Sequence, residues 1–410
     1  MTRSFDYRSF LFGTLLAFSA AGVIGLLGGC AEAGKKHETI KTEMTGKWNR
    51  ARLGVTYQLA QQQYEAGDYD KCRQTLAQAG SLNTPYAPLN VLTAKLELEK
   101  GNLEIAAANL KIAQQLDPAN PDAYYFMGVV FQRWQNAQSA ADFYRQAWER
   151  KSSEVTYLLA LVEMQITMGQ IDEAQKLLED KLAFFEQTAA VRVALGRTYA
   201  LQGQHEKACK LYRDAVILSP DDLSLRQTYA ESLYTTAKYS EALPILEDLR
   251  KNPAITDRDN ITIVLGQTLL NLHRTREARG CFQELTQNNP SNITALLGLG
   301  RVYLQDNDPV QALQTSAHVL KLEPDNSQAL ILQALAQQKQ HRWADSAATL
   351  THAQKLAPKD STVLCMLGLT SQNLGQPERA AAFFEQARAA NPQDTWAAEL
   401  LAALKPPAKD

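Results

Sequence analysis

Cys30 stands in surroundings that suggest chemistry at its thiol. It follows two glycines in the run "LLGGC", and residues 11–27 before them form a largely apolar stretch. Arg3 and Arg8 precede that stretch. A secretory signal has three parts, which are a positively charged N-terminal region, an apolar core and small residues before the cleavage site. Two neighbours of minimal size would let a peptidase reach this position, and the thiol could accept a lipid through a thioether bond.

The Leu-Gly-Gly-Cys end resembles the signal of bacterial lipoproteins, in which the cysteine receives a diacylglycerol and becomes the first residue after cleavage. The resemblance implies a signal peptide at residues 1–29 and lipidation, including palmitate, at Cys30. Two or three acyl chains exceed what stable membrane anchoring needs. Because Ala31 is not an inner-membrane retention signal, the resemblance also implies the outer membrane, with the body facing the periplasm. The alternative is an uncleaved membrane helix, since the apolar run is near the lower length limit for spanning a bilayer.

The other residues that could do chemistry form no recognisable site. Cys72, Cys209, Cys281 and Cys365 are far apart and include no CxxC pair, so we expect small core residues and not a zinc site or a disulfide framework. The chain has no glycine-rich phosphate loop with its lysine, no HExxH and no nucleophile elbow. We therefore expect no catalytic residue, no metal and no cofactor, and hence no enzyme. The net charge of -2 gives no electrostatic case for a nucleic-acid partner.

A repeating unit of 34 residues runs through most of the chain. Its clearest copy is "AAVRVALGRTYALQGQHEKACKLYRDAVILSP", residues 189–220. Stepping by 34 places repeats 1–6 at residues 53, 87, 121, 155, 189 and 223. After a slip of two residues, repeats 7–10 begin at 259, 293, 327 and 361, so that ten copies cover 53–394. Period and pattern together identify the chain as similar to the tetratricopeptide repeat (TPR) family.

The residue types at three positions of each repeat have a physical explanation. Position 8 is where the first helix of a repeat passes close to the second, and it is small in all copies but one: Ala60, Ala94, Gly128, Val162, Gly196, Ala230, Gly266, Gly300, Ala334 and Gly368. Position 20 is the matching contact on the second helix: Cys72, Ala106, Ala140, Ala174, Ala208, Ala242, Ala278, Ala312, Ser346 and Ala380. Position 32 often holds a proline that ends the second helix: Pro118, Pro220, Pro290, Pro324, Pro358 and Pro392.

The resemblance implies an all-α superhelical solenoid at residues 47–394, built from these helix-turn-helix repeats. Residues 30–46 show no apolar periodicity and predict a flexible tether after the lipidated cysteine. The run "TWAAELLAAL" predicts a capping helix, which together with a free tail occupies residues 395–410. Repeat 4 departs from the pattern at Val162, and repeat 6 departs through Pro244 and an insertion within 251–259. We favour sequence drift over a hinge as the cause.

In known TPR arrays, positions 2, 5, 9, 12 and 13 of the first helix line a concave groove. Carried over to this chain, these positions predict a partner-binding groove that includes Tyr57, Tyr64, Lys95, Tyr125, Arg133, Arg197, Tyr234 and Arg301. Five basic and five acidic residues share the positions, which argues against a polyanion. The aliphatic residues there either line the groove or pack between neighbouring helices. The lysine and asparagine that capture a free carboxylate in chaperone-binding TPRs are absent.

The resemblance implies a non-enzymatic scaffold for protein–protein interactions in the bacterial envelope, for instance in the assembly of an envelope machine. The partner would lie in the groove as an extended segment or a helix. A second hypothesis stays open, in which the groove tyrosines stack on sugars and the protein is a polysaccharide-binding or export component.

Overall fold

The computed structural model describes the backbone of residues 30–82, 84–393 and 395–404. Side chains are described within those ranges for residue 41 and from residue 43 onward. The predicted signal peptide at 1–29, the side chain of Cys30 and the tail after residue 404 lie outside this part of the chain.

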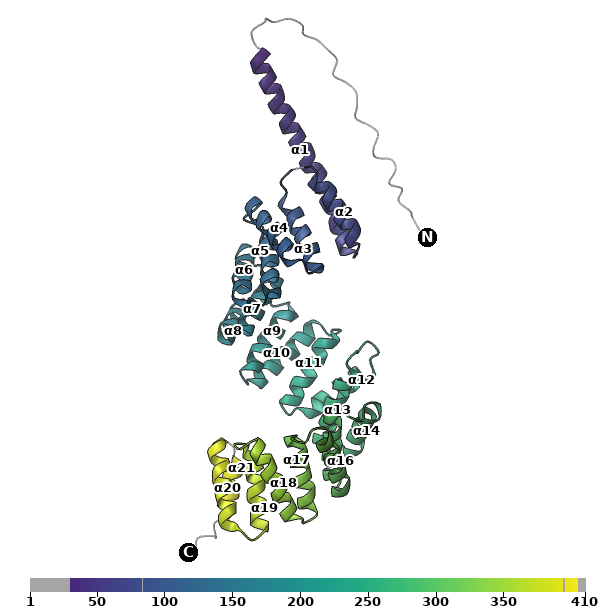
Figure 1. Cartoon of the computed structure of the whole chain (residues 1–410), viewed down its shortest axis with the longest axis vertical. Coiled ribbons are helices and arrows are strands. Elements are labelled where there is room, and N and C mark those ends of the chain that lie inside the picture. Colours follow the sequence, from purple (N-terminus) through teal and green to yellow (C-terminus); the bar gives the residue numbers. More distant parts are fainter. Residues whose placement is uncertain (1–29, 83, 394, 405–410) are drawn as a thin grey trace. The chain divides into compact units, whose positions relative to one another are not determined.

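Throughout the described ranges the secondary structure is helical and contains no strand, which confirms the predicted all-α class (Figure 1). The first helices of the ten repeats are α1 (Cys30–Glu65), α3 (Ala87–Glu99), α5 (Pro121–Arg133), α7 (Val155–Thr167), α9 (Ala189–Leu201), α11 (Leu223–Thr235), α13 (Arg258–Asn271), α15 (Ile293–Gln305), α17 (Ser327–Lys339) and α19 (Ser361–Asn373). The second helices are α2 (Tyr69–Gly80), α4 (Leu103–Leu116), α6 (Ala137–Arg150), α8 (Ile171–Leu182), α10 (His205–Leu218), α12 (Tyr239–Lys251), α14 (Thr275–Asn288), α16 (Pro309–Leu322), α18 (Trp343–Leu356) and α20 (Pro377–Ala390). The predicted repeat starts coincide with helix starts from α3 onward, except that α13 begins one residue early.

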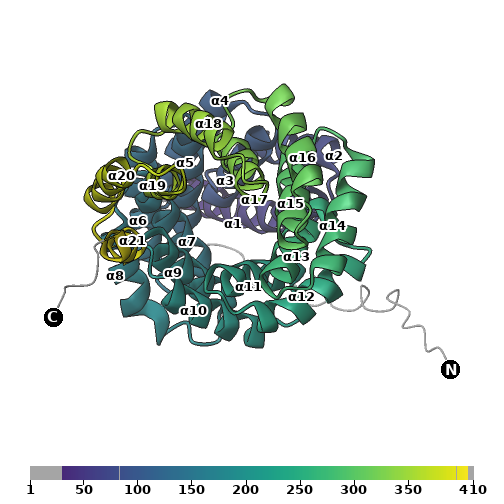
Figure 2. The same ribbon diagram turned by 90° about the horizontal axis from the view of Figure 1, so that it is seen from below.

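The helices form two compact units, and the boundary lies between Ser152 and Ser153, where repeat 3 gives way to repeat 4. The sequence predicts one continuous solenoid here and gives no sign of this division. In the second unit, the first helices of the repeats (α7 to α19) lie on the inner side of a curved row and the second helices (α8 to α20) on the outer side (Figure 2). The helices that carry the predicted groove positions therefore form the inner side of this unit.

The contact between the two helices of each repeat is as close as the small residues predict. Every described residue at positions 8 and 20 is buried, including Val162 and Ser346. A Cβ built on Gly368 would lie 2.2 Å from a ring carbon of Phe384, and one on Gly128 would lie 2.5 Å from the ring of Tyr144. Both rings occupy position 24 of the second helix. Position 8 is therefore small because the side chain at position 24 fills the space above it.

Positions 8 and 24 are matched in size. Glycine at position 8 lies against an aromatic ring in four repeats: Gly128 with Tyr144, Gly196 with Tyr212, Gly266 with Phe282, and Gly368 with Phe384. Alanine shares a core cluster with leucine in four others: Ala60 with Leu76, Ala94 with Leu110, Ala230 with Leu246, and Ala334 with Leu350. In these eight repeats each pair fills a similar volume, as close packing requires. Repeats 4 and 8 are different: repeat 4 has the larger Val162 at position 8 with Leu178 at position 24, and in repeat 8 Gly300 lies against Leu332 of the next repeat.

Replacing Ala208 with leucine should lower the free energy of unfolding by about 1–3 kcal/mol, because the added atoms overpack the contact between α9 and α10. Ala208 is 1% exposed, so the larger side chain has no solvent-facing rotamer. Denaturant unfolding of this variant and of Lys210→Leu, an exposed position on the same helix, would measure the effect. Equal midpoints for Ala208→Leu and the unmodified chain would show that position 20 does not face α9.

The structure differs from the sequence prediction at residues 30–46, where the predicted tether is helical and forms the start of α1. Alanine, glutamate and lysine are frequent in this segment and favour helix, and no proline interrupts it. The absence of apolar periodicity removes a packed face, but it does not remove helical propensity. The prediction of a tether was wrong because it took the lack of a packed face as a lack of helix.

The two irregular repeats keep their helices. Pro244 lies inside α12, which continues to Lys251, and the two added residues fall in the loop before α13. In repeat 4, α8 ends at Leu182 and a turn with Phe185 buried leads to α9. Both departures change how repeats are joined, and neither removes a repeat.

The C-terminal cap and the four cysteines after Cys30 have the structure that the sequence predicts. Residues 395–404 of the predicted cap form α21 (Thr395–Leu404), whose Ala397 is buried in a cluster with residues of α19 and α20. Cys72, Cys209, Cys281 and Cys365 are free and buried. Within the described ranges, no helix has both the length and the apolar character needed to cross a membrane.

Candidate partner-binding groove

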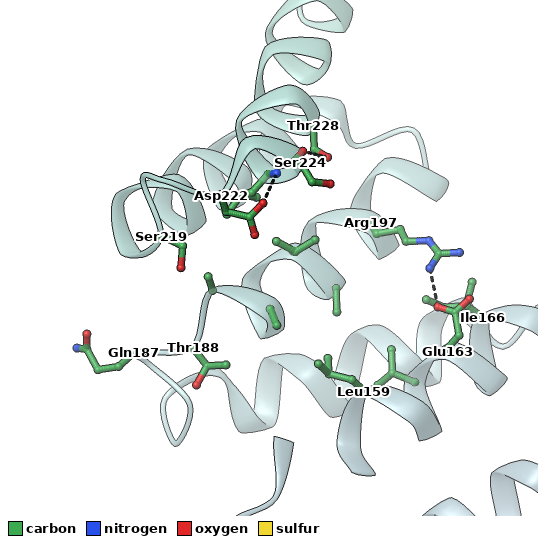
Figure 3. Close-up of a pocket in the computed structure, with 16 residues that line it drawn as sticks. Leu159, Glu163, Ile166, Gln187, Thr188, Arg197, Ser219, Asp222, Ser224 and Thr228 are labelled. Carbon is green, nitrogen blue, oxygen red and sulfur yellow. Dashed lines mark hydrogen bonds and ion pairs between the residues drawn. The ribbon is translucent and has the colours of Figure 1, made fainter. Parts of the chain in front are cut away.

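The inner helices of the second unit enclose a cavity of about 620 Å³ between α7, α9 and α11 (Figure 3). We call it the central cavity. Its floor is apolar and comes from two helices, with Leu159, Val162 and Ile166 on α7 and Val193 on α9. Leu159, Ile166 and Val193 occupy groove positions of the repeat and are half-buried, so part of each side chain is open to a ligand.

An ion pair closes one end of the central cavity. The Arg197 Nη1 atom on α9 lies 2.5 Å from Glu163 Oε2 on α7, and both side chains are about half exposed. Figure 3 shows this pair at the opposite end from Gln187 and Thr188. The charges neutralise each other, so this end offers hydrogen-bonding groups without a net charge. Arg197, predicted as a groove residue, thus lines a cavity but already holds a partner.

The other polar residues that line the cavity are uncharged apart from Asp222. The Asp222 carboxylate caps α11 by accepting a hydrogen bond from the Leu225 backbone N–H, at 3.0 Å. The Thr228 hydroxyl donates to the Ser224 carbonyl, also at 3.0 Å. An apolar floor with a small number of polar groups around it is the usual composition of a ligand-binding site. The central cavity can therefore hold apolar side chains while its rim bonds a peptide backbone.

A second cavity, of about 730 Å³, lies on the inner side of repeats 7–9, and we call it the basic cavity. Its lining comes from α13, α15, α17 and the start of α18: Leu270, Arg301, Leu304, Gln305, Leu335, Gln338, Lys339, His341 and Trp343. The predicted groove residue Arg301 lies here and also borders a smaller hollow with Tyr234. The structure thus brings two predicted groove residues to one stretch of the inner side.

In the first unit, Lys95 links two aromatic rings. Its Nζ atom lies 5.6 Å from the ring centre of Tyr64 and 4.8 Å from that of Phe126. The Tyr64 hydroxyl donates to Glu99 Oε1 at 3.2 Å, and burial together with the Glu99 carboxylate raises the pKa of Tyr64 to about 12. Tyr64 and Lys95 therefore lie together in the first unit.

The remaining groove residues of the first unit are engaged in packing or hydrogen bonds. The Tyr57 ring meets the Tyr86 ring edge-on with centres 5.9 Å apart, and burial raises the pKa of Tyr57. The ring centre of Tyr125 is 5.4 Å from that of Tyr144, the position-24 residue of its repeat. Arg133 donates to the Leu98 carbonyl. These contacts give each side chain a structural role, and a role in binding stays a prediction.

Some of the aliphatic residues at groove positions pack between helices, and the others are partly exposed on the inner side. Val91, Leu98 and Leu297 are buried between helices. The others are half-buried on the inner side of their helices: Leu159, Ile166, Val193, Ile263, Leu270, Leu304, Ile331 and Leu335. Half-burial at these places is what allows the two cavities to have apolar floors.

Sequence reasoning missed the residues that loops and helix starts contribute. Thr188, Ser219 and Asp222 reach the rim of the central cavity from the connections between repeats. His341 and Trp343 reach the basic cavity from the turn between α17 and α18. Asp222 is readable as a helix cap from its place before α11, but its position beside a cavity depends on how neighbouring repeats pack. Within the described residues, no three His, Cys, Asp or Glu side chains are placed to hold a metal ion.

Comparison with known proteins adds two curated relatives. The chain is 24% identical over 289 residues to the cellulose synthase operon protein C of Xanthomonas axonopodis pv. citri, covering 67% of this chain and 19% of that protein. It is 21% identical over 273 residues to the TPR repeat-containing protein YpiA of Bacillus subtilis, covering 66% of this chain and 63% of that protein. The chain therefore spans less than two thirds of the length of either relative.

Two solved structures are also similar. The structure titled YrrB, a TPR protein with an unusual peptide-binding site, is 17% identical with a TM-score of 0.42, covering 46% of this chain and 97% of that one. The Cut9–Hcn1 structure is 12% identical with a TM-score of 0.45, covering 90% of this chain and 95% of that one.

The family comparison covers almost all of the repeat region. The family described as Tetratricopeptide repeat matches residues 56–299. A second family, described as Psidin, N-terminal TPR repeats region, matches residues 302–404. The first match alone takes in more than half of the chain and includes the helices of the central cavity. The chain belongs to the tetratricopeptide repeat family.

Proposed function

We propose that this protein is a non-enzymatic scaffold that holds an extended segment or a helix of a partner protein in the central cavity. The observation that carries the proposal is the open apolar floor on α7 and α9, bordered by hydrogen-bonding groups from α9, α11 and the connections between repeats. Apolar side chains of a partner would be removed from water on this floor, which is the main favourable term in most protein associations. The rim would satisfy the partner's backbone groups, so that they are not buried without hydrogen bonds.

We further propose that the scaffold is attached to the outer membrane of a bacterium through lipid on Cys30, with its repeats in the periplasm. The support is the sequence of residues 1–30, with its charged start, apolar run and Leu-Gly-Gly-Cys end. A partner held in the groove would thereby be concentrated near the membrane, as in the assembly of an envelope machine.

Polysaccharide binding through the groove tyrosines receives less support. Sugar stacking needs an open ring face, whereas Tyr57, Tyr64 and Tyr125 each have another aromatic ring within 6 Å. The similarity to a cellulose synthase operon protein covers 19% of that protein and does not specify a sugar site. Binding of a soluble envelope polysaccharide to the purified chain, lost in Tyr64→Ala, would favour this function over the scaffold.

The scaffold proposal predicts that crosslinking to a partner depends on the inner side of the array. A photo-activated crosslinking residue at Ala190, which is exposed and lines the central cavity, should give discrete protein adducts in intact cells. The same residue at Ile217, 70% exposed on α10, should not give them. The substitution Val193→Glu would place a charge on the apolar floor, and it should remove the adducts at Ala190.

Two results would contradict the scaffold proposal. Adducts of equal yield at Ala190 and Ile217 would mean that the inner side is not selective. Adducts at Ala190 that survive Val193→Glu would mean that the apolar floor is not the contact. Circular dichroism of Val193→Glu is the control for folding, and because Val193 is half-buried we expect an unchanged helical signal.

A further inference from the structure

The basic cavity differs from the central cavity in its charge. Arg301, Lys339 and His341 stand on its rim, and no aspartate or glutamate lines it. The central cavity, in contrast, contains Glu163 and Asp222 beside its single arginine. Over the whole chain, the numbers of basic and acidic residues at the groove positions are equal. Within single repeats they are not. In repeats 8 and 9 the only charged residues at those positions are Arg301 and Lys339, and both are basic.

The two strong cations of the basic cavity have no ionic partner within the described part of the chain. Arg301 and Lys339 are exposed, and no carboxylate of the described residues lies within ion-pair distance of either. In the same unit Arg197 is paired with Glu163, and in the first unit Arg133 donates to a backbone carbonyl. The charges of Arg301 and Lys339 are therefore available to a ligand.

The basic cavity is also lined by apolar side chains. Leu304 on α15 and Leu335 on α17 are half-buried, and so is Trp343 at the start of α18. A tryptophan next to leucines offers a large contact area to one inserted apolar side chain, and tryptophan and arginine are frequent among residues that dominate binding energy. The cavity thus combines an apolar contact with positive charge on its rim.

Close backbone packing fixes the helices around the basic cavity. A Cβ on Gly298 would lie 2.5 Å from the Phe282 ring of α14, and one on Gly300 would lie 2.2 Å from Leu332 of α17. The Gln338 side chain is held by a 2.9 Å hydrogen bond to the Thr370 hydroxyl of α19. A cavity whose walls are already fixed loses little conformational entropy when a ligand binds.

We propose that the basic cavity binds an acidic segment of a partner protein, in which an apolar side chain is flanked by carboxylates. The apolar side chain would pack on Leu304, Leu335 and Trp343, while the carboxylates would pair with Arg301 and Lys339. Arginine binds a carboxylate through two parallel hydrogen bonds, which adds orientation to attraction. This inference rests on the proposed scaffold function and gives the chemistry of the partner at one part of the groove.

Three labelled peptides of equal length test the proposal by fluorescence anisotropy with the full chain in mild detergent. The first alternates glutamate with leucine and phenylalanine, the second replaces each glutamate with glutamine, and the third replaces each apolar residue with alanine. We expect the first to bind at least about tenfold more tightly than either of the others. Its affinity should fall as salt is raised, because partly exposed charges are screened, while that of the second peptide should change little.

Variants assign the binding to the cavity. The double variant Arg301→Gln/Lys339→Gln should bind the acidic peptide at least about fivefold more weakly, since each exposed ion pair contributes modestly and two are lost. Its affinity for the glutamine peptide should be unchanged. The matched control is Lys355→Gln/Arg388→Gln, which removes two exposed charges from the outer helices α18 and α20 and should not affect binding. Equal thermal unfolding of both double variants would show that the fold is intact.

Three outcomes would overturn the acidic-segment proposal. They are equal affinity for the acidic and glutamine peptides, equal affinity for the acidic and alanine peptides, and unchanged binding in Arg301→Gln/Lys339→Gln. These outcomes can be distinguished from a failure of the scaffold proposal. Selective adducts at Ala190 that persist beside any of these outcomes would leave the scaffold in place and remove only the acidic partner.

Discussion

Replacing Gly368 with alanine should lower the free energy of unfolding by about 2 kcal/mol, although alanine is the better helix former. The added Cβ would lie 2.2 Å from the Phe384 ring, a distance that real Cβ contacts do not reach, so the ring or the helix must move. Phe384 is fully buried and has no open space into which it can turn. Denaturant unfolding followed by circular dichroism would measure the change.

The loss should be largely recovered in Gly368→Ala/Phe384→Leu. This double variant reproduces the alanine–leucine pair that repeats 1, 2, 6 and 9 use at the same two positions. Phe384→Leu alone should cost about 1–2 kcal/mol, because it leaves a cavity above the glycine. We therefore expect a favourable coupling of at least about 1.5 kcal/mol between the two substitutions.

Gly280→Ala is the matched control for this cycle. Gly280 lies in α14, and a Cβ there would meet nothing within 4 Å. The same substitution should therefore stabilise the chain by up to about 1 kcal/mol through helix propensity alone. Additive effects of Gly368→Ala and Phe384→Leu would refute the size-matching of positions 8 and 24.

Cys30→Ser should abolish lipid attachment and leave the protein as an unprocessed precursor or release it from the membrane. A serine hydroxyl cannot form the thioether that a lipidated cysteine carries, so the expected loss is complete. Radiolabelled palmitate incorporation and fractionation of the envelope would measure it. The matched control is Cys72→Ser, a buried cysteine of repeat 1, which should keep the label and the membrane location.

An unchanged outer-membrane location of Cys30→Ser would contradict the lipid anchor. It would favour the other interpretation of residues 11–27, in which they form an uncleaved membrane helix. Loss of the palmitate label without a change in location would show that Cys30 carries lipid but that the lipid is not needed to hold the protein at the membrane.

The sequence predicted the repeats well because their signals are local and recur in phase. Small residues at positions 8 and 20 and prolines at 32 each report one contact or one helix end, and ten copies reinforce one another. The helix boundaries follow directly. The sequence did not predict which residue packs against position 8. Gly196 lies against the ring of Tyr212 on the second helix of its repeat, and this contact is visible only in the packed structure.

The candidate cavities were predictable only in part. Groove positions identified Arg197 and Arg301, because the side of a helix that a residue faces follows from its place in the repeat. The ionic partners were not predictable, since Glu163 lies in the repeat before Arg197 and the pairing depends on how two repeats pack. Counting charges over the whole groove concealed the cations that gather in repeats 8 and 9. Rim residues from connecting loops carry no periodic signal at all.

The size-matched pairs constrain how such an array can change its length in evolution. Most pairs lie inside one repeat, so a duplication or deletion of one whole repeat carries both members and preserves the fit. Repeat 8 is the exception, because Gly298 accommodates Phe282 of repeat 7 and Gly300 accommodates Leu332 of repeat 9. Recombination that removed repeat 8 alone would separate both pairs, and a second copy of repeat 8 would place Gly300 of one copy beside Gly298 of the next, where no leucine fills the space. Repeats 7–9, which line the basic cavity, should therefore be inherited as one block, while their neighbours can be gained or lost singly.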